Sequence, residues 1–142
     1  MLITNHVLSG AVIGATAPDA ATAAVRGFVS HFVLDAVPHF GVDSRHFMRI
    51  DVPDGLLGLA TIYVIARATP RRQLLPVLAG IFGACLPDVE KPVRQFSGRS
   101  PFPPWFDRAH AAIQTESMHR WPVEIAAAAA SGAVLAALTR RR

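Results

Sequence analysis

The side chains best suited to chemistry lie where an apolar segment ends, in the stretch Ser30-His31-Phe-Val-Leu-Asp35-Ala-Val-Pro38-His39. On an α-helix, His31 and Asp35 are one turn apart and about 40° apart around the axis, so they share one face. Pro38 disfavours helix at the preceding residue, which places His39 just past the helix end, where its ring can turn back. Because imidazole and carboxylate groups bind zinc, manganese and iron, this spacing predicts a metal site.

Further potential ligands lie beside other apolar segments. His6 begins the first segment, and Asp88 follows the end of another, where the helix dipole disfavours an anion. Asp88 ends a Gly-Ala-x-x-Pro-Asp pattern that also occurs at Asp19. If successive helices alternate in direction, the predicted ligands fall at one end of the molecule: His6, His31, Asp35, His39 and Asp88. The structural alternative is that His31 and Asp35 form a hydrogen bond that locks two helices together.

Composition restricts the metal and the chemistry. Cys85 is the single cysteine, so the chain cannot form an internal disulfide or a thiolate zinc cage. We therefore expect a divalent metal, most simply zinc, held by nitrogen and oxygen ligands. Such a metal would lower the pKa of a bound water to near 7. Glu116 or Glu90 could then act as general base toward an ester or phosphoester.

The segments that position these residues are apolar, rich in Ala, Leu and Gly, and without strict alternation, which favours helices over strands. The chain of 142 residues is long enough for one domain. We predict an all-α compact bundle of about five helices, with a polar loop and an amphipathic segment over 88–120. The expected helices cover 5–17, 19–37, 54–68, 73–86 and 121–139.

Hydropathy places the chain on the border between soluble and membrane proteins. Hydrophobic residues make up 51% of the chain and charged residues 17%, with a mean hydropathy of +0.34. Only the second and fifth expected helices approach the roughly 20 residues that a membrane span needs. Gly10-x-x-x-Gly14 would allow close helix packing in lipid. We favour a multi-pass protein of the cell membrane over a soluble bundle.

The distribution of charged residues predicts that the two ends of the molecule differ. Arginine clusters at 67–72 and 140–142 fall opposite the end that holds most of the histidines and acids. The positive-inside rule then places the histidine-rich end outside the cytoplasm. The expected partners are membrane lipids and a lipid-like or phosphoester substrate. Nucleic acid is not expected, because no basic groove pattern interleaves with the aromatic residues, and the oligomeric state stays open.

Three motifs resemble a known group of bacterial proteins. They are Thr4-Asn-His6-Val-Leu-Ser-Gly10, Ser30-His31-x3-Asp35-x2-Pro38-His39 and Leu86-Pro87-Asp88. They are similar to motifs of the predicted membrane-bound metal-dependent hydrolases, whose H-x3-D element in turn resembles part of the zinc site of zinc-dependent phospholipase C proteins. The resemblance implies His6, His31, Asp35 and Asp88 as ligands. Glu90 and Lys91 stand where that family has a second acid and a histidine.

Three functions remain open from the sequence. The leading hypothesis is a membrane-embedded metal-binding protein that acts as a metal-dependent hydrolase on a lipid-like ester or phosphoester. The second is a non-catalytic membrane or interaction protein, in which the His and Asp residues pair to fix the helices. The third is a soluble helical bundle that binds an anionic partner through its arginine clusters.

Overall fold

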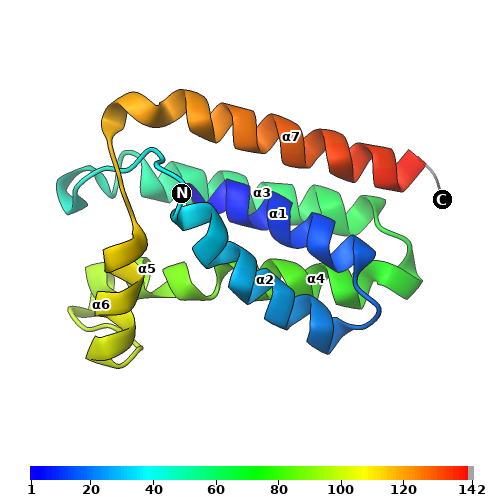
Figure 1. Ribbon diagram of the computed structural model, residues 1–142, viewed down its shortest axis with the longest axis horizontal. Helices are drawn as coiled ribbons and strands as arrows, with labels where there is room; N and C mark the ends of the chain where they lie inside the picture. Colours follow the sequence, from blue (N-terminus) through cyan, green and yellow to red (C-terminus); the bar gives the residue numbers. More distant parts are fainter. Residues whose placement is uncertain (141–142) are drawn as a thin grey trace.

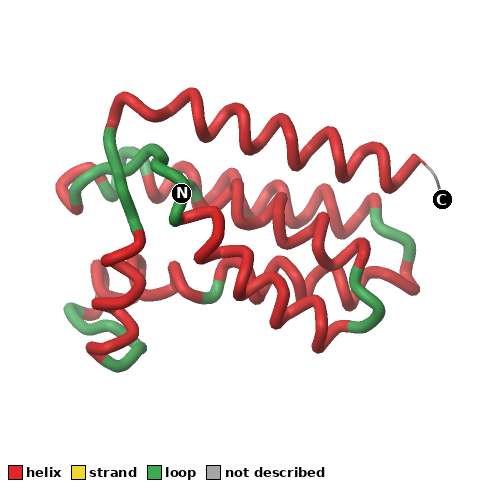
Figure 2. Tube along the Cα trace, in the orientation of Figure 1, coloured by secondary structure: helices red, strands yellow, loops and turns green. Residues whose placement is uncertain are grey.

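A computed structural model describes residues 1–140 and shows an all-helical fold (Figures 1 and 2). No β-strand occurs among these residues. The all-α prediction is confirmed, but the expected number of about five helices is too low, because seven α-helices form in the described part of the chain. They are α1 (Ile3–Thr16), α2 (Ala20–Asp35), α3 (Asp51–Ala68), α4 (Arg71–Cys85), α5 (Glu90–Ser97), α6 (Pro104–Ile113) and α7 (Trp121–Arg140).

Two helices, α5 and α6, lie inside the segment expected to be a polar loop followed by an amphipathic stretch. Helix α5 holds an ion pair between Glu90 and Arg94 at i and i+4 and ends at Gly98, whose positive φ of 75° suits a helix C-terminus. Helix α6 begins at Pro104, a residue favoured in the first turn because its missing N–H has no partner to lose there. Both helices are therefore specified by an ion pair and by residues at their ends rather than by a long apolar segment.

The helix ends also differ from the expected bounds by a few residues. Helix α2 ends at Asp35 rather than at residue 37, so His39 lies in the following loop. Asp19 is the N-cap of α2, and its side chain accepts a hydrogen bond from the Thr22 backbone N–H. Helix α3 starts at Asp51, three residues earlier than expected.

Helix α4 packs against both α1 and α2 through glycines. A Cβ atom added at Gly10 of α1 would lie 2.6 Å from the Gly80 carbonyl oxygen of α4. A Cβ added at Gly27 of α2 would clash with that same oxygen. Close approach of the three backbones therefore requires glycine at these positions, and it fixes α2, which carries His31 and Asp35, relative to α4.

The core between the helices is small, and α7 is mostly exposed. The centre of this core is formed by Val7, Ala11, Val77 and Ile81, with Ile65 of α3 beside them.

By length and composition, the described residues hold one helix able to cross a membrane, Met118–Arg140, with a mean hydropathy of 1.5. A second exists only if the bent pair Arg71–Cys85 and Pro87–Ser97 counts as one span. Helix α2, expected to be of full length, has only 16 residues.

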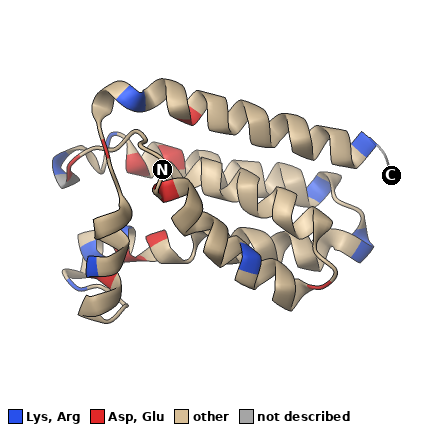
Figure 3. Cartoon of the chain, in the orientation of Figure 1, with Lys and Arg blue, Asp and Glu red and all other residues tan. Residues whose placement is uncertain are grey.

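Charged residues gather toward the two ends of the long helices (Figure 3). Acidic residues lie near the N-terminus of α1 and at the start of α3, whereas basic residues lie at both ends, among them those near the α3–α4 connection and at the end of α7. Residues 141–142, the rest of the second arginine cluster, lie outside the described residues.

Candidate metal centre

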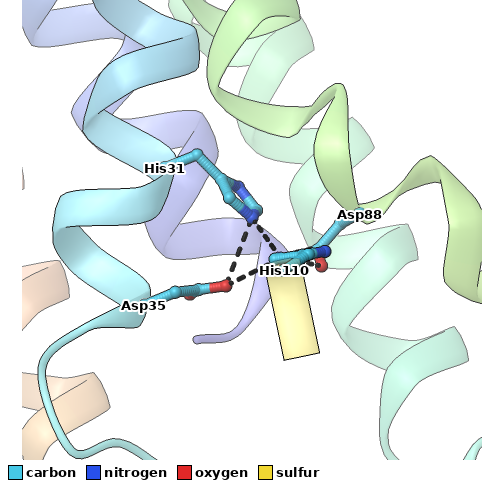
Figure 4. A group of neighbouring side chains, drawn as sticks. All are labelled: His31, Asp35, Asp88 and His110. Carbon is cyan, nitrogen blue, oxygen red and sulfur yellow. Dashed lines mark hydrogen bonds and ion pairs between the residues drawn. The ribbon is translucent and has the colours of Figure 1, made fainter. Parts of the chain in front are cut away.

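Four buried side chains from three elements converge at the end of α2 and α4 (Figure 4). His31 and Asp35 come from α2, Asp88 from the short 3-10 helix Pro87–Val89, and His110 from α6. Each offers one ligand atom, and these atoms all lie within 4.8 Å of one another. The group could hold a metal ion.

The distances around Asp35 suit a small ion. Asp35 Oδ2 lies 3.2 Å from His31 Nε2 and 3.2 Å from His110 Nε2, and the two ring nitrogens are 2.8 Å apart. Asp88 Oδ1 is more distant, 4.0 Å from His110 Nε2. A tetrahedral zinc site with bonds of about 2.0–2.1 Å places its ligand atoms about 3.3 Å apart. Asp88 Oδ1 would have to move closer to the other ligand atoms to complete such a set.

The backbone of α4 orients His31. Its Nδ1 lies 2.8 Å from the carbonyl oxygen of Ala84, in the last turn of α4. A carbonyl can only accept a hydrogen bond, so Nδ1 carries a proton, and Nε2 is the ring nitrogen that faces Asp35 and His110. A ring N–H held by a backbone carbonyl is a common way to fix a metal-binding histidine.

Gln114 supports the other side of the group. Its Nε2 donates to Asp35 Oδ2 at 2.7 Å and lies 3.2 Å from His110 Nε2. Since Gln114 follows His110 by one helical turn, the end of α6 brings both side chains to Asp35. Gln114 thus positions the carboxylate from outside the ligand set.

A short backbone pairing ties this end of α6 to the end of α2. The His39 N–H donates to the Thr115 carbonyl at 3.2 Å, and the Ser117 N–H donates to the His39 carbonyl at 3.1 Å. The pairing fixes the segment after α6 beside the segment after α2. It explains how His110, far from His31 in sequence, comes to lie against it.

Three of the five predicted ligands meet in this group: His31, Asp35 and Asp88. His6 lies beside them, with its Nε2 3.2 Å from Asp35 Oδ1. His39 lies past the end of α2, as expected, but it is not brought to the group because its ring turns away. There, Nδ1 lies 2.8 Å from the Val37 carbonyl oxygen and Nε2 lies 3.6 Å from Glu116.

His110 is the functional residue that sequence reasoning missed. His110 is not among the five ligands predicted from the sequence. The available signal was its spacing of four from Gln114 on an amphipathic segment, which places an imidazole and an amide on one helix face. Such pairs are common on solvated helices, so the spacing alone does not distinguish a ligand.

The predicted general bases lie outside the four-residue group. Glu116 and Glu90 both line a cavity of about 310 Å³, which Gln114 also lines. The imidazole of His39 beside Glu116 lowers the pKa of that carboxyl below its usual range, so Glu116 is ionised at neutral pH. Glu90 instead pairs with Arg94 at 2.6 Å.

A second, apolar cavity of about 410 Å³ reaches the centre from the α1–α3 side. Ile3, Val7, Leu59 and Phe96 are among its lining residues, and Asp88 lies at its wall. Both cavities share Lys91. The centre is therefore flanked by one polar and one apolar space.

Comparison of the chain with protein-family models, with curated proteins and with solved structures gives no match. The fold and site define a class: an all-helical protein with a buried His/Asp group that could hold a metal ion.

Proposed function

We propose that this protein is a membrane-embedded metal-binding protein, with zinc as its metal, and that it hydrolyses a lipid-like ester or phosphoester. The observation that carries the metal is the convergence of His31, Asp35, Asp88 and His110 in a buried site. Buried ionisable groups are costly unless paired or bound to a metal. Here two imidazole nitrogens lie 2.8 Å apart, a contact that either a proton between the rings or a shared cation stabilises.

The exposed apolar residues support the membrane location. Along α2, Val25, Val29 and Val33 form a row at spacings of four, and each is more than half exposed. Along α3, the row Leu56, Leu59 and Tyr63 is exposed to the same degree. Soluble monomers rarely expose apolar patches of this extent.

Helix α7 supports the same location. Only 6% of its most apolar 18-residue window is buried, whereas the core helix of a soluble protein would be mostly buried. Helices α1 to α4 are shorter than the hydrocarbon core of about 30 Å, so we expect the bilayer to thin around them.

Arg67 lies in the last turn of α3, and Arg71 and Arg72 begin α4. This α3–α4 connection lies at the end opposite the metal centre (Figure 3). By the positive-inside rule, we propose that this end faces the cytoplasm and that the metal centre lies near the outer surface.

The two cavities support a lipid-like substrate. The apolar cavity suits an acyl chain, and the polar cavity beside it holds Lys91 and Arg94 near the ionised Glu116. A divalent ion at the centre would supply Lewis-acid stabilisation of charge on an ester or phosphoester oxygen. Glu116 would accept the proton of the attacking water.

One contact favours a second candidate, a non-catalytic protein in which the group is structural. Lys91 Nζ lies 2.9 Å from Asp88 Oδ1, so a cation already pairs with one carboxylate of the centre. In that case Asp35 would serve only to join α2 to α1 and α6.

Metal analysis of the detergent-purified protein separates the two candidates. Our proposal expects stoichiometric zinc that is lost in Asp35→Ala and kept in the control Asp43→Ala, a change at an exposed aspartate. Folded, metal-free wild-type protein after zinc addition would leave only the structural role. Resistance to extraction by carbonate tests the membrane location, and cleavage of bis(p-nitrophenyl) phosphate tests hydrolysis.

A further inference from the structure

The two carboxylates of the centre divide their oxygens between two sets of histidine nitrogens. Asp35 Oδ2 faces His31 and His110, whereas Oδ1 lies 3.2 Å from His6 Nε2. Asp88 is arranged in the same way: Oδ1 lies toward His110 at 4.0 Å, and Oδ2 lies 3.8 Å from His6 Nε2. Each carboxylate thus presents one oxygen to each set, which is the arrangement of a carboxylate that bridges two metal ions.

His6 is a buried side chain that lies near two carboxylates without a well-formed hydrogen bond. It is 0% exposed, and neither its Nδ1 nor its Nε2 makes a hydrogen bond of acceptable geometry. Buried polar groups almost always make hydrogen bonds, so a buried imidazole that faces two carboxylates without a well-formed hydrogen bond indicates a cation between them. The four-residue group leaves His6 out, and a single ion therefore does not account for it.

The stacking of His6 on His31 sets the distance between the two possible ion positions. Their ring centroids lie 4.1 Å apart with an interplanar angle of 23°. The two rings are nearly parallel and both Nε2 atoms face Asp35, so ions bound to the two Nε2 atoms would lie side by side. In two-metal sites the ions lie about 3.5–4 Å apart, which matches this stacking distance.

We propose that the centre holds two divalent ions bridged by Asp35 and Asp88. The first ion takes His31 and His110, and the second takes His6. This proposal rests on the proposed metal centre and adds a second ion to it. Two ions could clamp both the attacking and the leaving oxygen of an in-line displacement, which favours a phosphate ester among the proposed substrates.

The second ion is expected to bind more weakly than the first. It has one histidine where the first ion has two, and the amino group of Met1 lies 2.7 Å from Asp35 Oδ1. The Met1 group shares the oxygen that faces His6, so the second ion must compete with it. Zinc should consequently load in two steps.

Zinc content per chain tests the proposal in the wild type, in His6→Phe and in the control His39→Phe. Phenylalanine keeps a flat ring against His31 and removes the ligand. His39 is an equally buried histidine whose Nε2 also lacks a hydrogen bond but faces Glu116. We expect two equivalents in the wild type and in His39→Phe, and one in His6→Phe.

One equivalent in the wild type, or two retained in His6→Phe, would overturn the second ion and leave the proposed centre standing. No zinc in the folded wild type would overturn both. Should His6→Phe fail to fold, Mn²⁺ loading of the wild type decides. Two ions at this spacing give an exchange-coupled electron paramagnetic resonance spectrum, and an uncoupled six-line signal at full loading would contradict the proposal.

Discussion

Two groups of ionisable residues lie at the histidine-rich end and differ in what holds them. Asp35, His31 and His6 come from helices that pack against α4 through glycines, and the Asp35 side chain is 0% exposed. Glu116 and His39 come from the segments after α6 and α2, and the Glu116 side chain is 35% exposed. The same residue types thus converge on one point where rigid helix ends meet, and form a simple pair where loops meet.

Among the substitutions that separate the two groups, Asp35→Asn is expected to have the largest effect. The amide keeps the shape of the side chain but removes the charge that faces three histidines, so we expect loss of all bound zinc. Elemental analysis of the purified variant measures it. The matched change Glu116→Gln should leave the zinc content unaltered, and equal losses in both variants would show that the two groups do not differ in function.

Glu116→Gln should instead remove activity. If Glu116 is the general base, its loss lowers the rate of phosphodiester cleavage by about 10²–10⁴-fold without loss of metal. Because the base must be deprotonated and His39 lowers the pKa of Glu116, this group stays active below the ordinary glutamate pKa of about 4.3. Glu90→Gln is the control, and a larger loss there would transfer the role to Glu90.

Gly80→Ala tests the packing that distinguishes the two groups. The new Cβ would clash with the Gly10 carbonyl oxygen of α1, and relief of such overpacking costs about 1–3 kcal/mol. We expect a lower melting temperature in detergent and weaker metal binding. Gly132→Ala of α7, where nothing lies within 4 Å, should be neutral or stabilising. Equal melting temperatures would show that the close contact of α4 with α1 is unimportant.

Gln114→Ala tests the support of the centre with the smallest expected effect. Loss of the hydrogen bond to Asp35 Oδ2 should weaken zinc affinity by about 10–100-fold, the usual effect of removing a group that orients a ligand. Competition with a zinc chelator measures the change. Gln95→Ala, at the wall of the polar cavity, is the control and should bind zinc as the wild type does.

Much of the fold could be predicted from the sequence, because long apolar segments bounded by Pro and Asp specify helices. Helices α5 and α6 could not, since they depend on an ion pair, Pro104 and Gly98 rather than on apolar periodicity. The number of membrane spans also could not be predicted: residue composition suggested several, yet α2 ends at Asp35, too short to qualify.

The site was predictable in part. His31 and Asp35 share a helix face, so local spacing was sufficient to pair them. Asp19 and Asp88 occur in the same sequence pattern, but Asp19 is an exposed N-cap whereas Asp88 is buried at the centre. Local sequence does not distinguish these outcomes, because the packing of α4 against α2 decides them. His110 was missed for the same reason, since a backbone pairing between two loops brings it to Asp35.

Zinc affinity of the wild type, His110→Ala and His39→Ala tests the central claim most directly. Both histidines are buried at the same end of the molecule, but only His110 faces Asp35. The account predicts tight binding in the wild type, a large loss in His110→Ala and wild-type affinity in His39→Ala. No zinc binding by the folded wild type, or equal affinity in the wild type and His110→Ala, would contradict it.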